Sequence, residues 1–213
     1  MAADNDASRN DSPSSFERHA PATRSLWPRR AVIRGFLVAA GSGIGAFYAD
    51  ARQAKAAEKL ASIPTAAREK AMRHAIAVAK RNPVYPFGAV ITTIADGRVV
   101  AEGVNASSRN PMLHGEVAAM NNYLHRHGNK DWAEMVLYTT AEPCSMCMSA
   151  LVWAGIGGVI FGTSLAGLKH AGIDQIDIPA ATVVGASPFW HGELLGGVLA
   201  SETDALFATG KKG

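Results

Sequence analysis

The only two cysteines of this 213-residue chain, Cys144 and Cys147, lie three positions apart. Two cysteines cannot form the disulfide framework of a small secreted scaffold. Upstream of them, His114 and Glu116 lie two positions apart. Thiolate sulfur and imidazole nitrogen are donors that zinc prefers. A fold that uses these groups together must bring the two segments into contact, and this requirement constrains the fold more than any other feature.

The two cysteines belong to a stretch that predicts a helix over 144–155. Pro143 precedes it, and proline suits the first turn of a helix. Cys144 and Cys147 then share one helix face. The positive end of the helix dipole favours thiolate over thiol, so the pair is half of a zinc site. With His114 as a third ligand, one tetrahedral position stays open, as in catalytic zinc sites.

Glu116 is placed to move protons beside such a metal. Spacing alone does not bring it there, because residues two apart on a regular helix point away from each other. His114 and Glu116 converge only if the chain is still turning into a helix, predicted over 115–128 and ended by Gly128. The upstream pair Asn110-Pro111 favours such a helix start.

The remaining pattern alternates helices with strands. Apolar periodicity predicts a helix over 65–81, and Asp96-Gly97 predicts a hairpin within 87–105. Further predicted elements are strands at 134–140, 157–163 and 181–185, a short helix near 164–170, and a final helix over 197–210. This alternation predicts an α/β layered fold, a sheet covered by helices.

The charge is unevenly distributed along the chain. The first 56 residues hold eight Lys/Arg and five Asp/Glu, which accounts for the whole net charge of +3. From Ala57 onward there are thirteen of each sign. A neutral body offers no broad electrostatic footprint for a phosphate backbone, although local basic patches remain open. A nucleic-acid partner is therefore not expected.

Residues 1–56 are interpreted as a leader. Arg29-Arg30 precede an uncharged apolar run over 36–49, and small-residue sites follow it. This layout is typical of an export signal, and the paired arginines resemble the twin-arginine class. The run is only fourteen residues long, short of the ~20 that span a bilayer. Cleavage is expected before Ala57, with Ala49-Asp50-Ala51 as a competing site. We expect a periplasmic or otherwise exported protein with no stable membrane span after cleavage.

The segments "HGE" and "PCSMC" together match the H-x-E…P-C-x-x-C signature, so the chain resembles the zinc-dependent cytidine/deoxycytidylate deaminase-like superfamily. "PFGAVI", "GVN" and "LYTTAEPCSMC" add to the resemblance, which covers about residues 65–172. It implies a deaminase domain over 57–213 with a three-layer α/β/α fold and a central mixed sheet of about five strands. It also implies one Zn²⁺ per chain and a homodimer.

The resemblance also assigns roles to residues. His114, Cys144 and Cys147 are the implied zinc ligands, and Glu116 is the implied catalytic proton shuttle. The implied substrate contacts are Asn105, which would bond the substrate ring, together with Gly115 and Trp153. Without the resemblance, Asn105 would be a turn residue and Trp153 a core residue.

The implied reaction replaces an exocyclic amine of a free nucleobase or nucleoside by water. "PFGAVI" and "ALVWAGI" resemble bacterial guanine deaminases, whereas "LHGE" and "LYTT" resemble fungal cytosine deaminases, and guanine is slightly favoured. A tRNA adenosine deaminase, a non-catalytic zinc protein and a C-x-x-C redox protein remain alternatives. A closed structural zinc would need a fourth ligand, and the available histidines are His74, His125, His127, His170 and His191.

Overall fold

The computed structural model describes residues 59–208 of the chain. The leader predicted for residues 1–56, including Arg29-Arg30 and both cleavage sites, lies outside the described residues. Within 59–208, none of the helices has the length and apolar character needed to cross a bilayer. The predictions of export and compartment therefore stay predictions.

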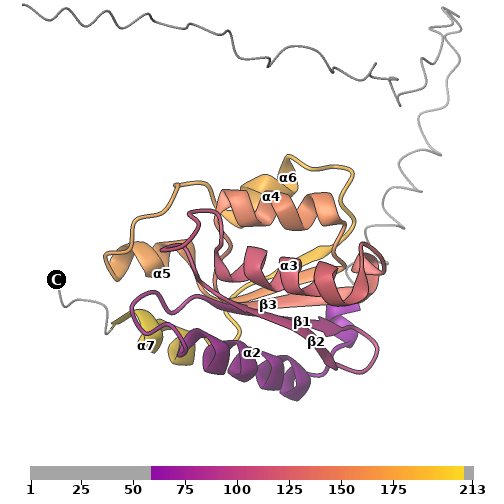
Figure 1. Cartoon of the computed structure of the whole chain (residues 1–213), viewed down its shortest axis with the longest axis horizontal. Coiled ribbons are helices and arrows are strands. Elements are labelled where there is room, and N and C mark those ends of the chain that lie inside the picture. Colours follow the sequence, from indigo (N-terminus) through magenta and orange to yellow (C-terminus); the bar gives the residue numbers. More distant parts are fainter. Residues whose placement is uncertain (1–58, 209–213) are drawn as a thin grey trace, which may run out of the picture. The chain divides into compact units, whose positions relative to one another are not determined.

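The centre of the fold is a mixed sheet of five strands in the order β2-β1-β3-β4-β5 (Figure 1). The strands are β1 (Gly88–Thr93), β2 (Val99–Val104), β3 (Met135–Ala141), β4 (Gly158–Thr163) and β5 (Glu193–Leu195). β1 pairs antiparallel with both β2 and β3, and the predicted hairpin around Asp96-Gly97 is confirmed. The β3–β4 and β4–β5 pairs are parallel.

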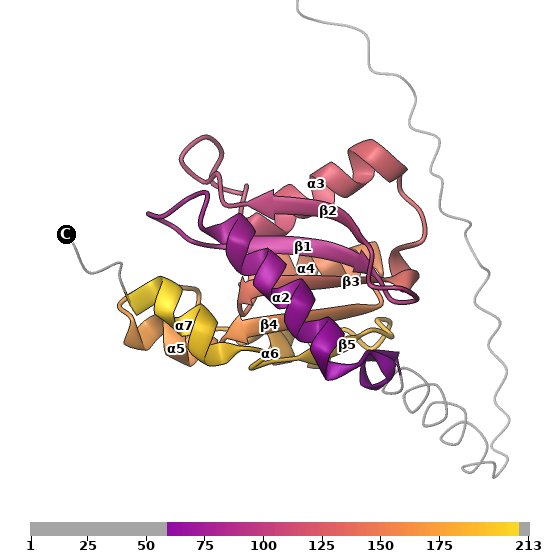
Figure 2. The same ribbon diagram turned by 90° about the horizontal axis from the view of Figure 1, so that it is seen from below.

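Helices cover both faces of the sheet, as Figures 1 and 2 show. One face packs against α2 (Thr65–Ala79) and α7 (Ala200–Ala208), and the other against α3 (Gly115–His127), α4 (Ser145–Ala154) and α6 (Ala180–Gly185). A short helix, α5 (Leu165–His170), follows β4. The predicted three-layer α/β/α architecture with a five-stranded mixed sheet is confirmed.

Strand periodicity divides the core between the two faces. Along β1, Ala89 and Ile91 belong to the cluster under α3 and α4, while Val90 belongs to the cluster under α2. Successive side chains of a strand point to opposite faces, so each buried strand serves both layers. The edge strand β2 approaches α3 closely at Gly103, where an added Cβ would lie 2.1 Å from the backbone nitrogen of Ala119. This contact fixes the position of α3 on the sheet.

The prediction of a strand at 181–185 is wrong, because these residues lie in α6. Pro179 precedes the helix, and the buried Ala180 begins it, while Val183 and Val184 pack against the core cluster of α3 and α4. Tertiary packing of these two valines overrides their preference for strands. The fifth strand is instead the three-residue β5, which no sequence pattern indicated.

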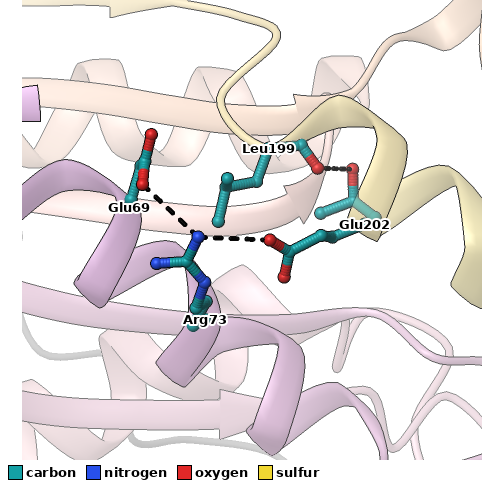
Figure 3. A network of polar contacts seen from close by, with 5 residues as sticks. Glu69, Arg73, Leu199 and Glu202 are labelled. Atoms are coloured by element: carbon teal, nitrogen blue, oxygen red, sulfur yellow. Dashed lines mark hydrogen bonds and ion pairs between the residues drawn. The ribbon is translucent and has the colours of Figure 1, made fainter. Parts of the chain in front are cut away.

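A polar network joins α7 to α2 on the surface (Figure 3). Arg73 of α2 lies 3.3 Å from a carboxylate oxygen of Glu69 and 3.3 Å from one of Glu202 in α7. The carbonyl of Leu199, just before α7, accepts a bond from the hydroxyl of Thr203. Exposed ion pairs each contribute at most about 1 kcal/mol. Burial of Phe207, which is 1% exposed, is therefore the larger contribution to holding α7.

Candidate metal centre

The start of α3 carries the first half of the site. His114 is the N-cap residue, with extended backbone angles (φ −68°, ψ 164°), and the helix begins at Gly115. Glu116 lies in the first turn. The prediction that these residues converge where the helix begins is therefore confirmed. A side chain at Gly115 would collide with β1, because its Cβ would lie 2.8 Å from the carbonyl oxygen of Phe87.

The start of α4 carries the second half and has the same backbone design. Cys144 is the N-cap residue, again with extended angles (φ −60°, ψ 164°), and α4 begins at Ser145. Cys147, in the first turn, is fully buried. The helix predicted over 144–155 is confirmed in kind, although Pro143 precedes the N-cap and does not lie in the first turn.

The two helix starts bring three possible ligand atoms together. The ligand atoms of His114, Cys144 and Cys147 all lie within 4.8 Å of one another, and Nδ1 of His114 is 3.5 Å from Sγ of Cys144. Zinc bonds of about 2.0 Å to nitrogen and 2.3 Å to sulfur, at a tetrahedral angle, would separate two such ligands by about 3.5 Å. The donor set and its spacing therefore fit zinc.

The pKa values of the two thiols are shifted in opposite directions. A hydrogen bond from Cys147, helped by one from His114, lowers the pKa of Cys144 to about 4. The same bond to Cys144, together with burial, raises the pKa of Cys147. The bond to Cys144 also raises the pKa of His114. Zinc binding displaces protons from thiol and imidazolium ligands, so the metal would replace these hydrogen bonds.

Glu116 is the charged group of the site that lies deepest. Its side chain is 4% exposed, and Oε1 accepts a hydrogen bond of 3.0 Å from the hydroxyl of Thr139. Burial raises the pKa of Glu116, which suits a group that must take up and return a proton near neutral pH. The sequence analysis did not single out Thr139. Strand periodicity could have identified it, because Thr139 and Leu137 face the same side of β3.

Asn105 directly follows β2 and is buried, with 6% of its surface exposed. Its side-chain amide donates to the hydroxyl of Ser107, and its side-chain carbonyl accepts from the Ser107 backbone N–H. This local turn opens the loop that leads to His114, since Ala106 in turn donates to Leu113. In this structure the side chain of Asn105 thus makes a turn, and its predicted bond to a substrate ring stays a prediction.

Trp153 does not lie at the metal centre. The expectation that it is a core residue is wrong, because 79% of its surface is exposed. Its ring contacts that of Phe189 at a centroid distance of 5.1 Å. Both rings line a separate pocket with Lys59 and His191. Trp153 is near the C-terminal end of α4, whereas the thiols are at its N-terminal end.

A pocket of about 530 Å³ lies beside the metal ligands, a volume in the range of small-molecule sites. His114, Cys144 and Met146 line it, together with Pro111, which lies three residues before His114. The opposite wall comes from the connection between α5 and α6, through Asp174, Gln175 and Ile176. No sequence pattern had indicated these three residues.

The other histidines of the described residues do not complete a closed zinc site. Within 59–208, the only group of three or more possible metal ligands is His114, Cys144 and Cys147. His74 pairs with Glu102 at 3.0 Å, and His127 contacts the carbonyl of Val100. Three ligands alone would leave one position of a tetrahedral zinc without a protein ligand, as in catalytic sites.

Residues 65–163 match the family model described as the cytidine and deoxycytidylate deaminase zinc-binding region. The chain is 37% identical over 103 residues to a guanine deaminase of Bacillus subtilis, covering 45% of this chain and 65% of that protein. It is 36% identical over 93 residues to a tRNA-specific adenosine deaminase of Streptococcus pyogenes, covering 43% and 52%. It is 33% identical over 96 residues to a probable cytosine deaminase of Schizosaccharomyces pombe, covering 44% and 58%. The matches thus span between 52% and 65% of the length of these relatives.

Among solved structures, a guanine deaminase from Nitrosomonas europaea superimposes with a TM-score of 0.59 at 21% identity, covering 65% of this chain and 81% of that one. This likeness concerns the fold, a mixed five-stranded sheet flanked by helices.

Proposed function

We infer from the membership of this chain in the cytidine and deoxycytidylate deaminase family, whose zinc-binding region its residues 65–163 form, that the protein is a hydrolytic deaminase of a free nucleobase or nucleoside. The observation that carries the proposal is the convergence of two helix starts. They place His114, Cys144 and Cys147 around one point, with the buried Glu116 beside them. Guanine is the leading substrate.

His114, Cys144 and Cys147 would hold the zinc, which would supply a Lewis acid able to activate water for addition to an electron-poor ring carbon. Glu116 then moves the protons. Oε1 is held by Thr139, so Oε2 would carry the protons. It would pass the first proton of the water to a ring nitrogen and the second, from the added hydroxyl, to the departing amine. Water and the amino compound thus become a ring carbonyl and ammonia. The residues that line the pocket would orient the ring beside Glu116 for this exchange.

Three substrate classes follow from the relatives. Guanine is favoured by the 37% identity to the Bacillus subtilis guanine deaminase and by the segments "PFGAVI" and "ALVWAGI". Cytosine is supported by "LHGE" and "LYTT" and by the Schizosaccharomyces pombe relative. A tRNA adenosine is supported by the Streptococcus pyogenes relative. The balance of thirteen basic and thirteen acidic residues after residue 56 disfavours tRNA.

The experiment is an ammonia-release assay of the zinc-loaded protein against guanine, cytosine, cytidine, adenosine and a tRNA anticodon stem-loop. We expect the highest kcat/KM with guanine. A preference for cytosine would retain the reaction and change the substrate. Turnover of the stem-loop alone would contradict the free-base proposal and support a tRNA adenosine deaminase. If zinc is bound and no compound yields ammonia, the result would support a non-catalytic zinc-binding protein.

We further propose that the predicted leader directs export by the twin-arginine route, so that the domain folds and acquires its metal before it crosses the membrane. Replacement of Arg29 and Arg30 by lysine keeps the charge and removes the guanidinium groups. Export should stop in this variant, and unchanged export would refute the twin-arginine assignment. The homodimer implied by the family resemblance also stays a prediction.

A further inference from the structure

The residue before Pro143 makes a contact that the proposed zinc chemistry does not use. Glu142 follows β3 directly and lies two positions before Cys144. Its carboxylate accepts two backbone hydrogen bonds from distant parts of the chain. Oε2 accepts the N–H of Leu165 at 2.8 Å, and Oε1 accepts the N–H of Ala180 at 2.8 Å.

The two donors belong to the two helices that flank a segment lining the pocket. Leu165 is the first residue of α5, and Ala180 is the first residue of α6. Between these two helices runs the connection over 171–179, which contributes Asp174, Gln175 and Ile176 to the pocket wall (Figure 1). One carboxylate therefore bonds the start of the helix before this connection and the start of the helix after it.

The start of the connection packs against the core, because Ala171 and Ile173 contact the cluster of Ala141, Leu168 and Phe207. Further along it, Asp177 pairs with Lys169 at 2.7 Å, with both side chains at the surface. Exposed pairs of this kind contribute little. Ile176, at 58% exposure, and Ile178, at 41%, are not buried in the core. Beyond the packing of its first residues, the connection is therefore held by the two charge-assisted bonds from Glu142 to the helices on either side of it.

We propose that Glu142 is a positioning residue, which holds the wall formed by Asp174, Gln175 and Ile176 at a fixed distance from the metal ligands and so sets the affinity for the substrate ring. The effect on affinity rests on the proposed deaminase function, whereas the attachment of the wall does not. Since Glu142 precedes Cys144 by two residues, the same short segment carries both the metal ligand and the anchor of the opposite wall.

The test is a graded series of variants in the zinc-loaded full chain. Glu142→Gln retains one acceptor oxygen and replaces the other with an amide that cannot accept, so one bond is lost. Glu142→Ala loses both. Glu193→Ala is the matched control, because Glu193 also accepts two backbone N–H groups, from Lys59 and Leu60, and lines no part of the metal-site pocket.

The first measurement is amide hydrogen exchange over 171–179. Exchange should rise by about tenfold or more in Glu142→Ala, as expected for loss of charge-assisted bonds. It should rise less in Glu142→Gln and stay unchanged in Glu193→Ala. Zinc content should stay at one per chain in Glu142→Gln. If Glu142→Ala does not fold, Glu142→Gln still reports on the wall. The proposal would be overturned if exchange is unchanged in both Glu142 variants. It would also be overturned if Glu142→Ala does not fold and exchange is unchanged in Glu142→Gln.

The second measurement is the division between KM and kcat for the base with the highest turnover. A displaced wall weakens binding of the ground state and the transition state alike, so KM should rise about tenfold while kcat stays within about threefold. Greater exchange with an unchanged KM would overturn the role in affinity. If no base is turned over by any variant or by the unchanged protein, the deaminase proposal fails, and the exchange data still decide whether Glu142 holds the wall.

Discussion

The two helix starts of the metal centre use one backbone design for different chemistry. In both, an extended N-cap residue and a first-turn residue point into the same space, His114 with Glu116 and Cys144 with Cys147. At α4 both side chains are candidate metal ligands. At α3 one is a candidate ligand and the other is a buried carboxylate bonded to Thr139. Substitution of Glu116 at α3 should therefore remove proton transfer and leave the metal bound. Substitution of either cysteine at α4 should remove the metal and the activity together.

The largest expected effect is at α4. Cys147→Ser removes a buried thiol whose sulfur is one of three ligands. Replacement of residues that merely support zinc ligands already costs about 10–100-fold in affinity or activity, and loss of a ligand should cost more. Elemental analysis should find the variant without zinc, and ammonia release should fall to background. Full zinc occupancy would show that Cys147 is not a ligand.

Glu116→Gln should separate the two functions of the α3 start. The amide keeps the shape of the side chain and its bond to Thr139, and it cannot carry the proton. Zinc should stay at one per chain, while kcat should fall by about 10²-fold or more. Zinc analysis and steady-state kinetics on the same preparation check both values. Turnover near that of the unchanged protein would assign the proton to another group.

Thr139→Val probes the support of Glu116. Thr139 is fully buried, and valine has nearly the same shape without the hydroxyl. Loss of one hydrogen bond to a charged group should lower kcat by about tenfold, with zinc unaffected. Thr163→Val is a suitable control, because Thr163 is also a buried strand threonine with a hydroxyl bond, in its case to Thr203. An equal loss of kcat in both variants would indicate a general packing defect.

Gly115→Ala tests the fit between α3 and β1. The new Cβ would lie 2.8 Å from the carbonyl oxygen of Phe87, so α3 must shift. We expect destabilisation of about 1–3 kcal/mol, as for other overpacked sites. Urea unfolding measures this loss of stability, and the zinc content should remain near one per chain. Unchanged stability would mean that the α3 start adapts easily, and the geometry of His114 and Glu116 would then be less tightly fixed than this contact indicates.

Local patterns predicted the elements that frame the site. The apolar spacing over 65–81 and the Asp96-Gly97 turn are short-range signals, and they were sufficient for α2 and the β1–β2 hairpin. The approach of His114 to the cysteines was predictable from their donor chemistry and from the family resemblance, since no local signal joins 114 to 144. Its confirmation shows that a ligand set can report a long-range contact.

Long-range contacts without such chemistry were not predictable. The bonds from Leu165 and Ala180 to Glu142 span 23 and 38 residues and leave no local pattern. The valines of α6 favoured a strand locally, and packing against α4 decided otherwise. Trp153 looked like a core residue, although its helix turns it outward against Phe189.

The most direct test of the site is X-ray absorption at the zinc edge of the purified, zinc-loaded protein. The account predicts one zinc per chain with two sulfur ligands at about 2.3 Å, one imidazole and one further light ligand from solvent. A shell with two imidazoles would indicate a closed structural site. A protein that takes up no zinc and carries a Cys144–Cys147 disulfide would contradict the account and support a redox role for the two cysteines.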